Sequence, residues 1–183
     1  MDISSKNNSK ILCIGNSSRL SDAISPVLSC ISYVVMNNMN QPGKERSIFL
    51  VDELPTMNLY GLDKFIAEVR KHGVSTVLAL QDFNQAERDY GQKSANILRT
   101  SCANQFFGNT GNLDTAKSVC DNLGDIKKSQ TSFTEQHSGS GSQTESFQKE
   151  KVLQPRDITA QPPGHFLCKI ADGKPAYSFV QLN

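Results

Sequence analysis

Ile48-Phe49-Leu50-Val51-Asp52-Glu53 is the stretch of the 183-residue sequence that decides the fold. Four apolar residues run directly into two carboxylates. A continuous apolar run of this length is typical of a strand that is buried on both faces of a parallel sheet. Ionised carboxylates are costly to bury unless they are paired or bind a metal. The carboxyl ends of parallel strands are also where open α/β sheets bind ligands.

The same six residues fit the pattern of a Walker B strand. In that motif the Asp holds the Mg²⁺ of a bound nucleotide, often through water, and the following Glu polarises the attacking water. The alternative is a buried strand that ends in an exposed Asp-Glu turn. Both interpretations remain open on these six residues alone.

A second apolar strand is predicted over residues 74–80, and it ends at Gln81. Between the two strands, the spacing of apolar residues predicts a helix from about 59 to 72, followed by Gly73 as a left-handed cap. The buried stripe of this helix is expected to consist of Leu62, Phe65, Ile66 and Val69. Such a βαβ unit would place Asp52, Glu53 and Gln81 side by side at one edge of the sheet.

The remaining pattern predicts a domain that combines strands and helices. A short strand is expected over 11–15, and a helix that begins near Ser21 or Asp22 should bury Ile24, Val27, Leu28, Ile31, Val34 and Val35. Further on, the sequence predicts a turn or short helix over 85–91, a helix over 93–102, a strand over 104–107 and a helix over 113–123. Two strands, over 165–170 and 176–180, should form a hairpin around Asp172-Gly173.

Four segments follow from this pattern: a frayed amino terminus (1–10), an α/β core (11–124), a flexible loop (125–151) and carboxyl-terminal strands that complete the domain (152–183). The loop assignment rests on its Ser-, Gln- and Gly-rich composition, which cannot bury enough apolar surface to order itself.

Bulk properties argue against several functional classes, although a local basic patch remains possible. The net charge of +1 gives no overall indication of nucleic-acid or membrane-surface binding. The five cysteines are odd in number, widely spaced and lack any Cys-x-x-Cys pair, which argues against a disulfide framework and against a zinc site. Reduced, mostly buried thiols are expected instead. No segment is long and apolar enough to cross a bilayer, and no signal peptide follows Met1.

Several short motifs occur in a fixed order along the chain. They are Asp52-Glu53 with Leu54-Pro55-Thr56, then Val69 to Val74, Leu78 to Asp82, Tyr90-Gly91, Asn104 to Gly108, the helix from Ala116 to Gly124, and Pro162-Pro163-Gly164 with Asp172-Gly173. In this order they resemble the carboxyl-terminal half of the RecA-like motor domain of type IV secretion coupling proteins. These are the TraG/TraD-type conjugation ATPases, and the TraG-like proteins of Bacteroidetes mobile elements are especially similar.

The resemblance implies a function for individual residues. Asp52 matches the Walker B Asp that holds Mg²⁺, and Glu53 matches the catalytic Glu. Gln81 matches the polar sensor of the γ-phosphate, so Asp52 and Gln81 would contact the ATP–Mg²⁺ complex. Arg70 matches an arginine that reaches a nucleotide in the neighbouring subunit, where it would stabilise charge on the transferring phosphoryl group.

The resemblance also implies partners and a location. Such motors are hexamers on the cytoplasmic face of the inner membrane, anchored there by helices that these residues lack. They deliver a relaxase with its single-stranded DNA to the secretion channel.

One motif of a complete motor is missing. No Gly-x-x-x-x-Gly-Lys-[Ser/Thr] occurs in the 183 residues, so nothing here cradles the phosphates. The expected fold is therefore a partial RecA-like P-loop sheet that lacks the Walker A half, and we expect the chain to be inactive as an ATPase by itself. Two alternatives remain open: a non-catalytic interaction module of the same machinery, and a different hexameric DNA translocase related to FtsK or HerA.

Overall fold

The computed structural model describes residues 4–5, 8–17, 19–134, 142–172 and 177–182. The chain forms two compact units, residues 1–104 and 105–183. The boundary between them therefore precedes the end of the core that the sequence predicted over 11–124.

The first unit is built around two parallel strands, β3 (Ser47–Val51) and β4 (Val74–Leu78). Ser47 lies opposite Val74, and Val51 lies opposite Leu78. The connection runs through the 3₁₀ helix η1 (Leu54–Thr56), α2 (Leu62–Val69) and the 3₁₀ helix η2 (Arg70–His72), so the predicted βαβ unit is confirmed. Gly73 ends the connection with a φ of 75°, as predicted for a left-handed cap.

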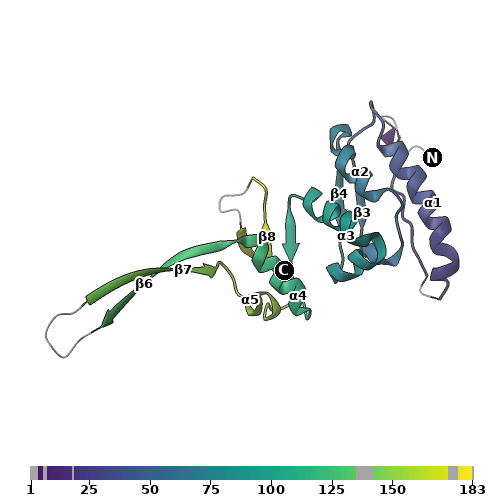
Figure 1. Ribbon diagram of the computed structural model, residues 1–183. Coiled ribbons are helices and arrows are strands. Elements are labelled where there is room, and N and C mark those ends of the chain that lie inside the picture. The colour runs from purple at the N-terminus through teal and green to yellow at the C-terminus, as the bar shows by residue number, and fades with distance from the viewer. Residues whose placement is uncertain (1–3, 6–7, 18, 135–141, 173–176, 183) are drawn as a thin grey trace. The chain divides into compact units, whose positions relative to one another are not determined.

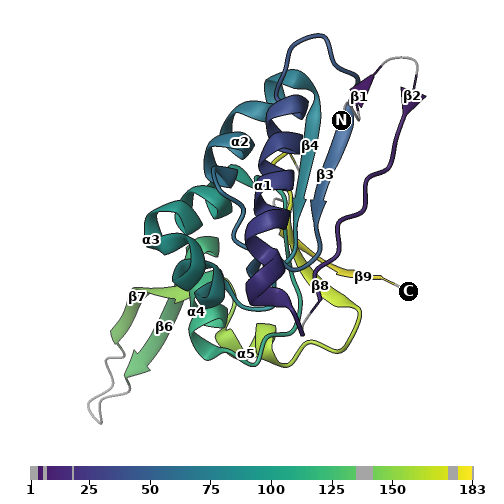
Figure 2. The ribbon, with the colours of Figure 1, turned by 90° about the vertical axis from the view of Figure 1, so that its right-hand side faces the viewer.

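Three helices surround one apolar cluster in this unit: α1 (Ser21–Met39), α2 and α3 (Phe83–Ser101). Figures 1 and 2 show them beside the β3–β4 pair. The predicted stripe of α2 is confirmed, because Leu62, Phe65, Ile66 and Val69 are all buried. Phe49 and Val51 of β3 pack against the same cluster.

The expectation that β3 is buried on both faces is wrong within this unit. Ile48 and Leu50 are 69% and 63% exposed, and Val77 of β4 is 47% exposed. Successive side chains of a strand point to opposite faces of the sheet. One set of side chains therefore packs against the helices, and none of the described residues of this unit covers the other set. The first unit therefore presents an apolar face formed by Ile48, Leu50 and Val77.

The buried face of α1 also differs from the prediction. Val35 is buried as expected, but Val27, Ile31 and Val34 are exposed, whereas Met36 and Met39 are 2% and 3% exposed. Apolar residues occur on more than one side of this helix, and local spacing could not reveal which side faces the cluster.

Three other local predictions can be compared with the structure. Residues 11–15 form no strand, and Ile11 is 94% exposed. Two very short strands, β1 (Ser4–Ser5) and β2 (Asn8–Ser9), pair within the segment expected to fray. The separate helical segments predicted over 85–91 and 93–102 form α3, whose backbone is not helical at Gly91.

The second unit contains a three-stranded sheet in the order β5 (Gln105–Phe107), β8 (His165–Lys169) and β9 (Tyr177–Gln181). All pairings in this sheet are antiparallel, and β8 and β9 are the two predicted hairpin strands. Gly173 of the predicted hairpin turn lies outside the described residues. Helices α4 (Leu113–Leu123) and α5 (Pro155–Thr159) pack with this sheet around a core of Ala116, Val119, Cys120, Ile158 and Leu167.

Within the flexible loop predicted over 125–151, the described residues form a pair of strands, and residues 135–141 lie outside the described part of the chain. β6 (Asp125–Thr134) and β7 (Ser142–Lys151) form an antiparallel ribbon of ten residues each. The polar composition of this segment indicated only that it does not form a packed core. It could not anticipate that two long strands satisfy their backbone hydrogen bonds by pairing with each other. Among the described residues, no helix combines the length and apolar character needed to cross a membrane.

Candidate functional site

The ends of β3 and β4 are joined by backbone hydrogen bonds that continue past both strands. The N–H of Ala79 donates to the carbonyl of Val51 at 2.8 Å, and the N–H of Leu54 donates to the carbonyl of Ala79 at 2.9 Å. The residues that follow each strand are therefore held next to one another at the carboxyl edge of the sheet. This is the edge at which α/β folds place their ligand sites.

A cavity of about 280 Å³ lies at this edge. Glu53 and Gln81, the residues that the sequence placed at the two strand ends, both line it. The other lining residues come from the η1 turn and the first part of α3, and they are Pro55, Thr56, Gln85 and Arg88. The structure thus brings together two of the four predicted site residues.

Glu53 has the most unusual environment of the set. Its side chain is half-buried, and its Oε1 atom is buried without a hydrogen-bond partner. A buried carboxylate oxygen that accepts no hydrogen bond is costly, and such groups in native proteins require an explanation. Glu53 also lines the cavity, so its carboxylate can accept a proton or a hydrogen bond from a ligand there.

Asp52 lies at the same strand end but does not line the cavity, and its side chain is exposed. It continues the alternation of the exposed residues Ile48 and Leu50, whereas Glu53 continues the alternation of Phe49 and Val51. Glu53 keeps an extended backbone, with φ −137° and ψ 98°. The two carboxylates therefore lie on opposite sides of the strand end.

Arg70 lies at the opposite edge of the sheet. It begins η2, its carbonyl accepts from the N–H of Gly73 at 3.1 Å, and β4 starts at Val74. A strand of five residues therefore separates Arg70 from the end that carries Gln81. Within one chain Arg70 does not belong to the cavity, so its function toward a neighbouring subunit stays a prediction.

Sequence reasoning missed the residues of α3 that hold this site. Tyr90 donates its hydroxyl to the carbonyl of Met57 and accepts from the N–H of Leu59, both at 3.0 Å. The side chain of Asn58 donates to the carbonyl of Asp89 at 3.1 Å. These contacts fasten the segment after Glu53 to α3. No local pattern predicts them, because the partners are far apart in the sequence.

Arg88 is the second residue that was missed. Arg88 lines the cavity together with Glu53 and Gln81. Its guanidinium pairs with both carboxylate oxygens of Asp89, at 2.6 and 3.1 Å. The hydrogen bond and charge of Asp89 raise the pKa of Arg88, so this group keeps its positive charge beside the cavity.

The oxygen donors at this edge fit a nucleotide-bound Mg²⁺ better than a metal held by protein alone. In the described part of the chain, no group of three or more His, Cys, Asp or Glu residues is arranged to hold a metal. Mg²⁺ at nucleotide sites is held by one or two carboxylates, phosphate oxygens and water. The exposed carboxylate of Asp52 can supply that share of the ligands.

The two parallel strands are followed by a carboxylate and an amide, and both side chains line one cavity. This arrangement is that of an α/β protein with a ligand site at the carboxyl edge of its sheet. Residues 46–163 match the family described as the TraM recognition site of TraD and TraG. The chain belongs to this family of coupling proteins, in agreement with the resemblance seen in the sequence.

Solved structures share the fold. The unbound monoclinic form of the bacterial conjugative coupling protein TrwBdeltaN70 has a TM-score of 0.74 and 22% identity, over 92% of this chain and 39% of that one. The TrwB complex with the GTP analogue GDPNP has a TM-score of 0.70 and 23% identity, over 92% and 39% of the two chains. The TrwB complex with ADP and Mg²⁺ has a TM-score of 0.70 and 23% identity, over 90% and 38%.

The chain thus spans about two fifths of the length of these coupling-protein structures. The match supports a partial RecA-like α/β fold, as the sequence predicted. No protein of curated function matches the sequence.

Proposed function

We propose that this region carries the catalytic carboxylate and the phosphate-sensing amide of an ATP-driven conjugative coupling protein. The observation that carries the proposal is that Glu53 lines one cavity together with Gln81 and also has a buried Oε1 atom without a hydrogen-bond partner. Family membership and the nucleotide complexes of TrwB support it. The ligand would be ATP with Mg²⁺, bound to a complete motor that also contains a phosphate loop.

Each residue has a separate chemical function in this proposal. Glu53 accepts a hydrogen bond from the attacking water and orients it toward the γ-phosphate. The amide of Gln81 hydrogen-bonds to the γ-phosphate. Asp52 would hold the Mg²⁺, directly or through water, and the ion would neutralise charge on the phosphates. Arg70, at the other edge of the sheet, reaches the nucleotide of the neighbouring subunit.

The proposed cellular function follows from the family. The complete protein assembles as a hexamer on the cytoplasmic face of the inner membrane. It couples ATP hydrolysis to the delivery of relaxase-bound single-stranded DNA to a type IV secretion channel. In this proposal the 183-residue chain contributes to the motor and does not hydrolyse ATP alone, since it lacks the phosphate loop.

The test replaces Glu53 in a complete motor that contains this region. Glu53→Gln keeps the size of the side chain but removes its capacity as a base, so turnover should fall about 10²- to 10⁴-fold. Asp52→Ala should also abolish turnover. The matched control is Glu45→Gln, because Glu45 is exposed and precedes β3 at the opposite edge of the sheet. Normal turnover by Glu53→Gln would refute the catalytic assignment.

The second candidate function is a non-catalytic module that assembles with other subunits. The exposed apolar residues Ile48, Leu50 and Val77 favour it, because contiguous apolar surface marks an interaction site. Purification of the tagged chain from cells should then capture an intact coupling ATPase, while the pure chain shows no turnover. Turnover by the pure chain would contradict this alternative.

A further inference from the structure

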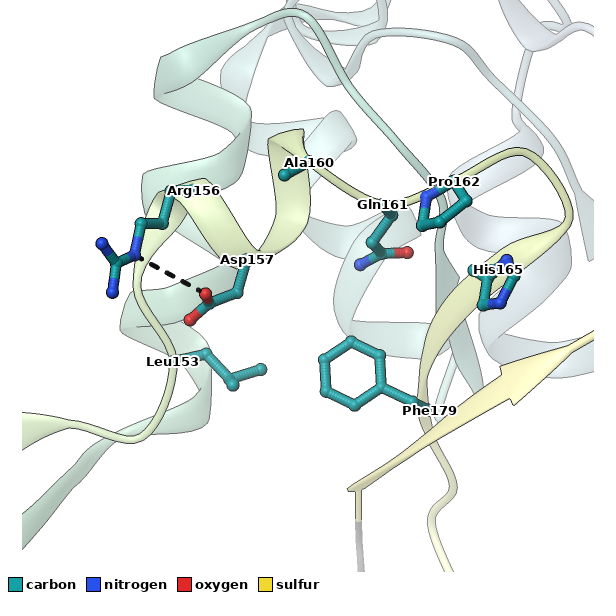
Figure 3. A pocket seen from close by; sticks show the side chains of 8 residues that line it. All are labelled: Leu153, Arg156, Asp157, Ala160, Gln161, Pro162, His165 and Phe179. Atoms are coloured by element: carbon teal, nitrogen blue, oxygen red, sulfur yellow. Dashed lines mark ion pairs between the residues drawn. The ribbon is translucent and has the colours of Figure 1, made fainter.

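The second unit contains its own cavity, of about 650 Å³. On one side it is bordered by α5 and the residues next to that helix, and on the other side by Phe179 of β9. Figure 3 shows the Phe179 ring turned toward Leu153 and Gln161 across the opening. The full lining is Leu153, Arg156, Asp157, Ala160, Gln161, Pro162, His165 and Phe179.

The register of the hairpin explains why Phe179 is available in this cavity. Phe179 pairs with Leu167, so both side chains point to the same face of the sheet. Leu167 is 1% exposed because it packs in the core that α4 and α5 complete, whereas Phe179 is 55% exposed. The helices therefore cover β8 but leave this residue of β9 open, and the cavity has an apolar wall beside a strand.

The outer edge of β9 has no pairing partner in the described part of the chain. The strand order places β9 at the end of its sheet, hydrogen-bonded only to β8. Natural proteins protect such edges with charged side chains, proline or a bulge, since unpaired backbone groups invite another strand. The β9 sequence Tyr-Ser-Phe-Val-Gln has none of these residues. An uncharged, aromatic and β-branched edge of this kind is suited to pairing.

The rim of the cavity carries an available positive charge. The side chain of Arg156 is 86% exposed, and its Nε lies 3.9 Å from Oδ1 of Asp157. The other carboxylate oxygen of Asp157 accepts from the N–H of Gln154 at 2.8 Å, so this carboxylate is already used to cap α5. At 3.9 Å and 86% exposure, the ion pair with Asp157 leaves the guanidinium open to solvent, so Arg156 can also pair with a carboxylate that a ligand supplies.

We propose that an extended segment of a partner protein adds to β9 as a further strand, with an apolar side chain in the cavity beside Phe179 and an acidic residue against Arg156. In strand addition, backbone hydrogen bonds give affinity and pockets for alternate side chains give specificity. Here the unpaired edge of β9 would supply the backbone hydrogen bonds, and the adjoining cavity would supply the side-chain pocket. The interaction is independent of the ATP site, because every residue that it uses belongs to the second unit.

A second copy of this chain fits the surface less well. Self-pairing would bring β9 against β9, and this strand carries no carboxylate. Arg156 would then lack the partner that its position favours. The charge at the rim therefore selects an acidic segment from another protein.

The first test measures the preference for an acidic segment. Fluorescently labelled peptides of about eight residues, an ordinary strand length, would alternate Val with Thr and carry either Glu or Lys near one end. By fluorescence anisotropy with the 183-residue chain, the Glu peptide should bind about fivefold more tightly than the Lys peptide. Arg156→Gln should remove this preference, and Lys149→Gln, an equal charge change at another exposed site of this unit, should keep it.

The second test examines the backbone and needs no protein variant. Methylation of every second peptide nitrogen should weaken binding about tenfold or more when it blocks the amides that face β9. Methylation of the alternate set should have little effect. Phe179→Ala should also weaken binding, whereas Val180→Ala, on the opposite face of the same strand, should not.

Three outcomes would overturn the proposal. They are no measurable binding of the Glu peptide, equal effects of the two methylation sets, and dimerisation of the chain through β9 in sedimentation experiments. The last result would assign the edge to a second copy.

Discussion

Glu53 and Gln81 follow two different strands and line one cavity, at the point where the parallel pairing of β3 and β4 ends. The hydrogen bond from Ala79 to Val51 holds these strand ends together. A carboxylate that can orient water and an amide that can contact a phosphate are thereby placed at one ligand site.

Gln81→Ala in a complete motor should lower kcat by about 10- to 100-fold and change KM little, because a group that contacts the transferring phosphoryl acts mainly in the transition state. Steady-state ATPase kinetics would measure both constants. Gln92→Ala is the control, since Gln92 is exposed on α3 and does not line the cavity. A mutant that raised only KM would indicate a function in ground-state binding.

The isolated 183-residue chain should show no micromolar binding of ATP with Mg²⁺ in isothermal titration calorimetry. The phosphate loop supplies most of the backbone donors and the lysine that hold the phosphates, and no such loop occurs in this sequence. The same experiment on a complete motor provides the positive control. Tight binding by the isolated chain would show that other residues cradle the phosphates.

Tyr90→Phe should destabilise the first unit by about 1–3 kcal/mol, because the carbonyl of Met57 and the N–H of Leu59 both lose their partner. Chemical denaturation would measure the free energy of unfolding. Tyr60→Phe is the matched control, since Tyr60 is 74% exposed. Equal stability of the two variants would contradict an anchoring function for the Tyr90 hydroxyl.

The stability should also depend on pH through Tyr90. Burial raises the pKa of Tyr90 above its ordinary value of 10.0, and the charge of Asp89 adds to the increase, while the hydrogen bond from Leu59 opposes it. The folded state therefore favours the neutral phenol. Its contribution should be complete below pH 10.0 and be lost as the pH rises through the folded-state pKa. Between wild type and Tyr90→Phe, the difference in unfolding free energy should shrink over that range.

Gly91→Ala should destabilise the protein by about 1–3 kcal/mol, since Gly91 adopts φ 76° and ψ 150°, a region that is almost restricted to glycine. Space is not the cause, because an added Cβ would meet no atom within 4 Å. Gly15→Ala is a matched control, as its Cβ would also meet nothing within 4 Å and its φ is not positive. Equal thermal unfolding of both variants would argue against the kink in α3.

The five cysteines of the native chain should differ in how fast iodoacetamide alkylates their thiols. Cys13 and Cys30 are exposed and should react first, whereas Cys120 and Cys168 are buried. Burial also raises the pKa of both buried thiols, so less of the reactive thiolate is present. Peptide mass spectrometry would follow each site, and labelling in denaturant should make all five equivalent. Early labelling of Cys120 would contradict the packing of the second core.

Local sequence patterns predicted the elements of the site. The apolar run that ends at Glu53, the stripe of α2 and the second run before Gln81 were sufficient to predict a parallel βαβ unit with polar strand ends. This worked because helix faces and buried strands have periodicities that are visible within a few turns or residues. The order of the motifs also indicated the coupling-protein family, which the family match confirms.

Only the tertiary structure decided which faces meet. It showed that α1 buries Met36 and Met39, that Tyr90 fastens the segment after Glu53, and that Arg88 lines the cavity. It also separated Arg70 from the cavity and paired residues 125–134 with residues 142–151. The sequence by itself determined the elements and their polar ends, because these depend on neighbouring residues. The contacts between distant segments depend on how whole elements pack, and no local pattern encodes them.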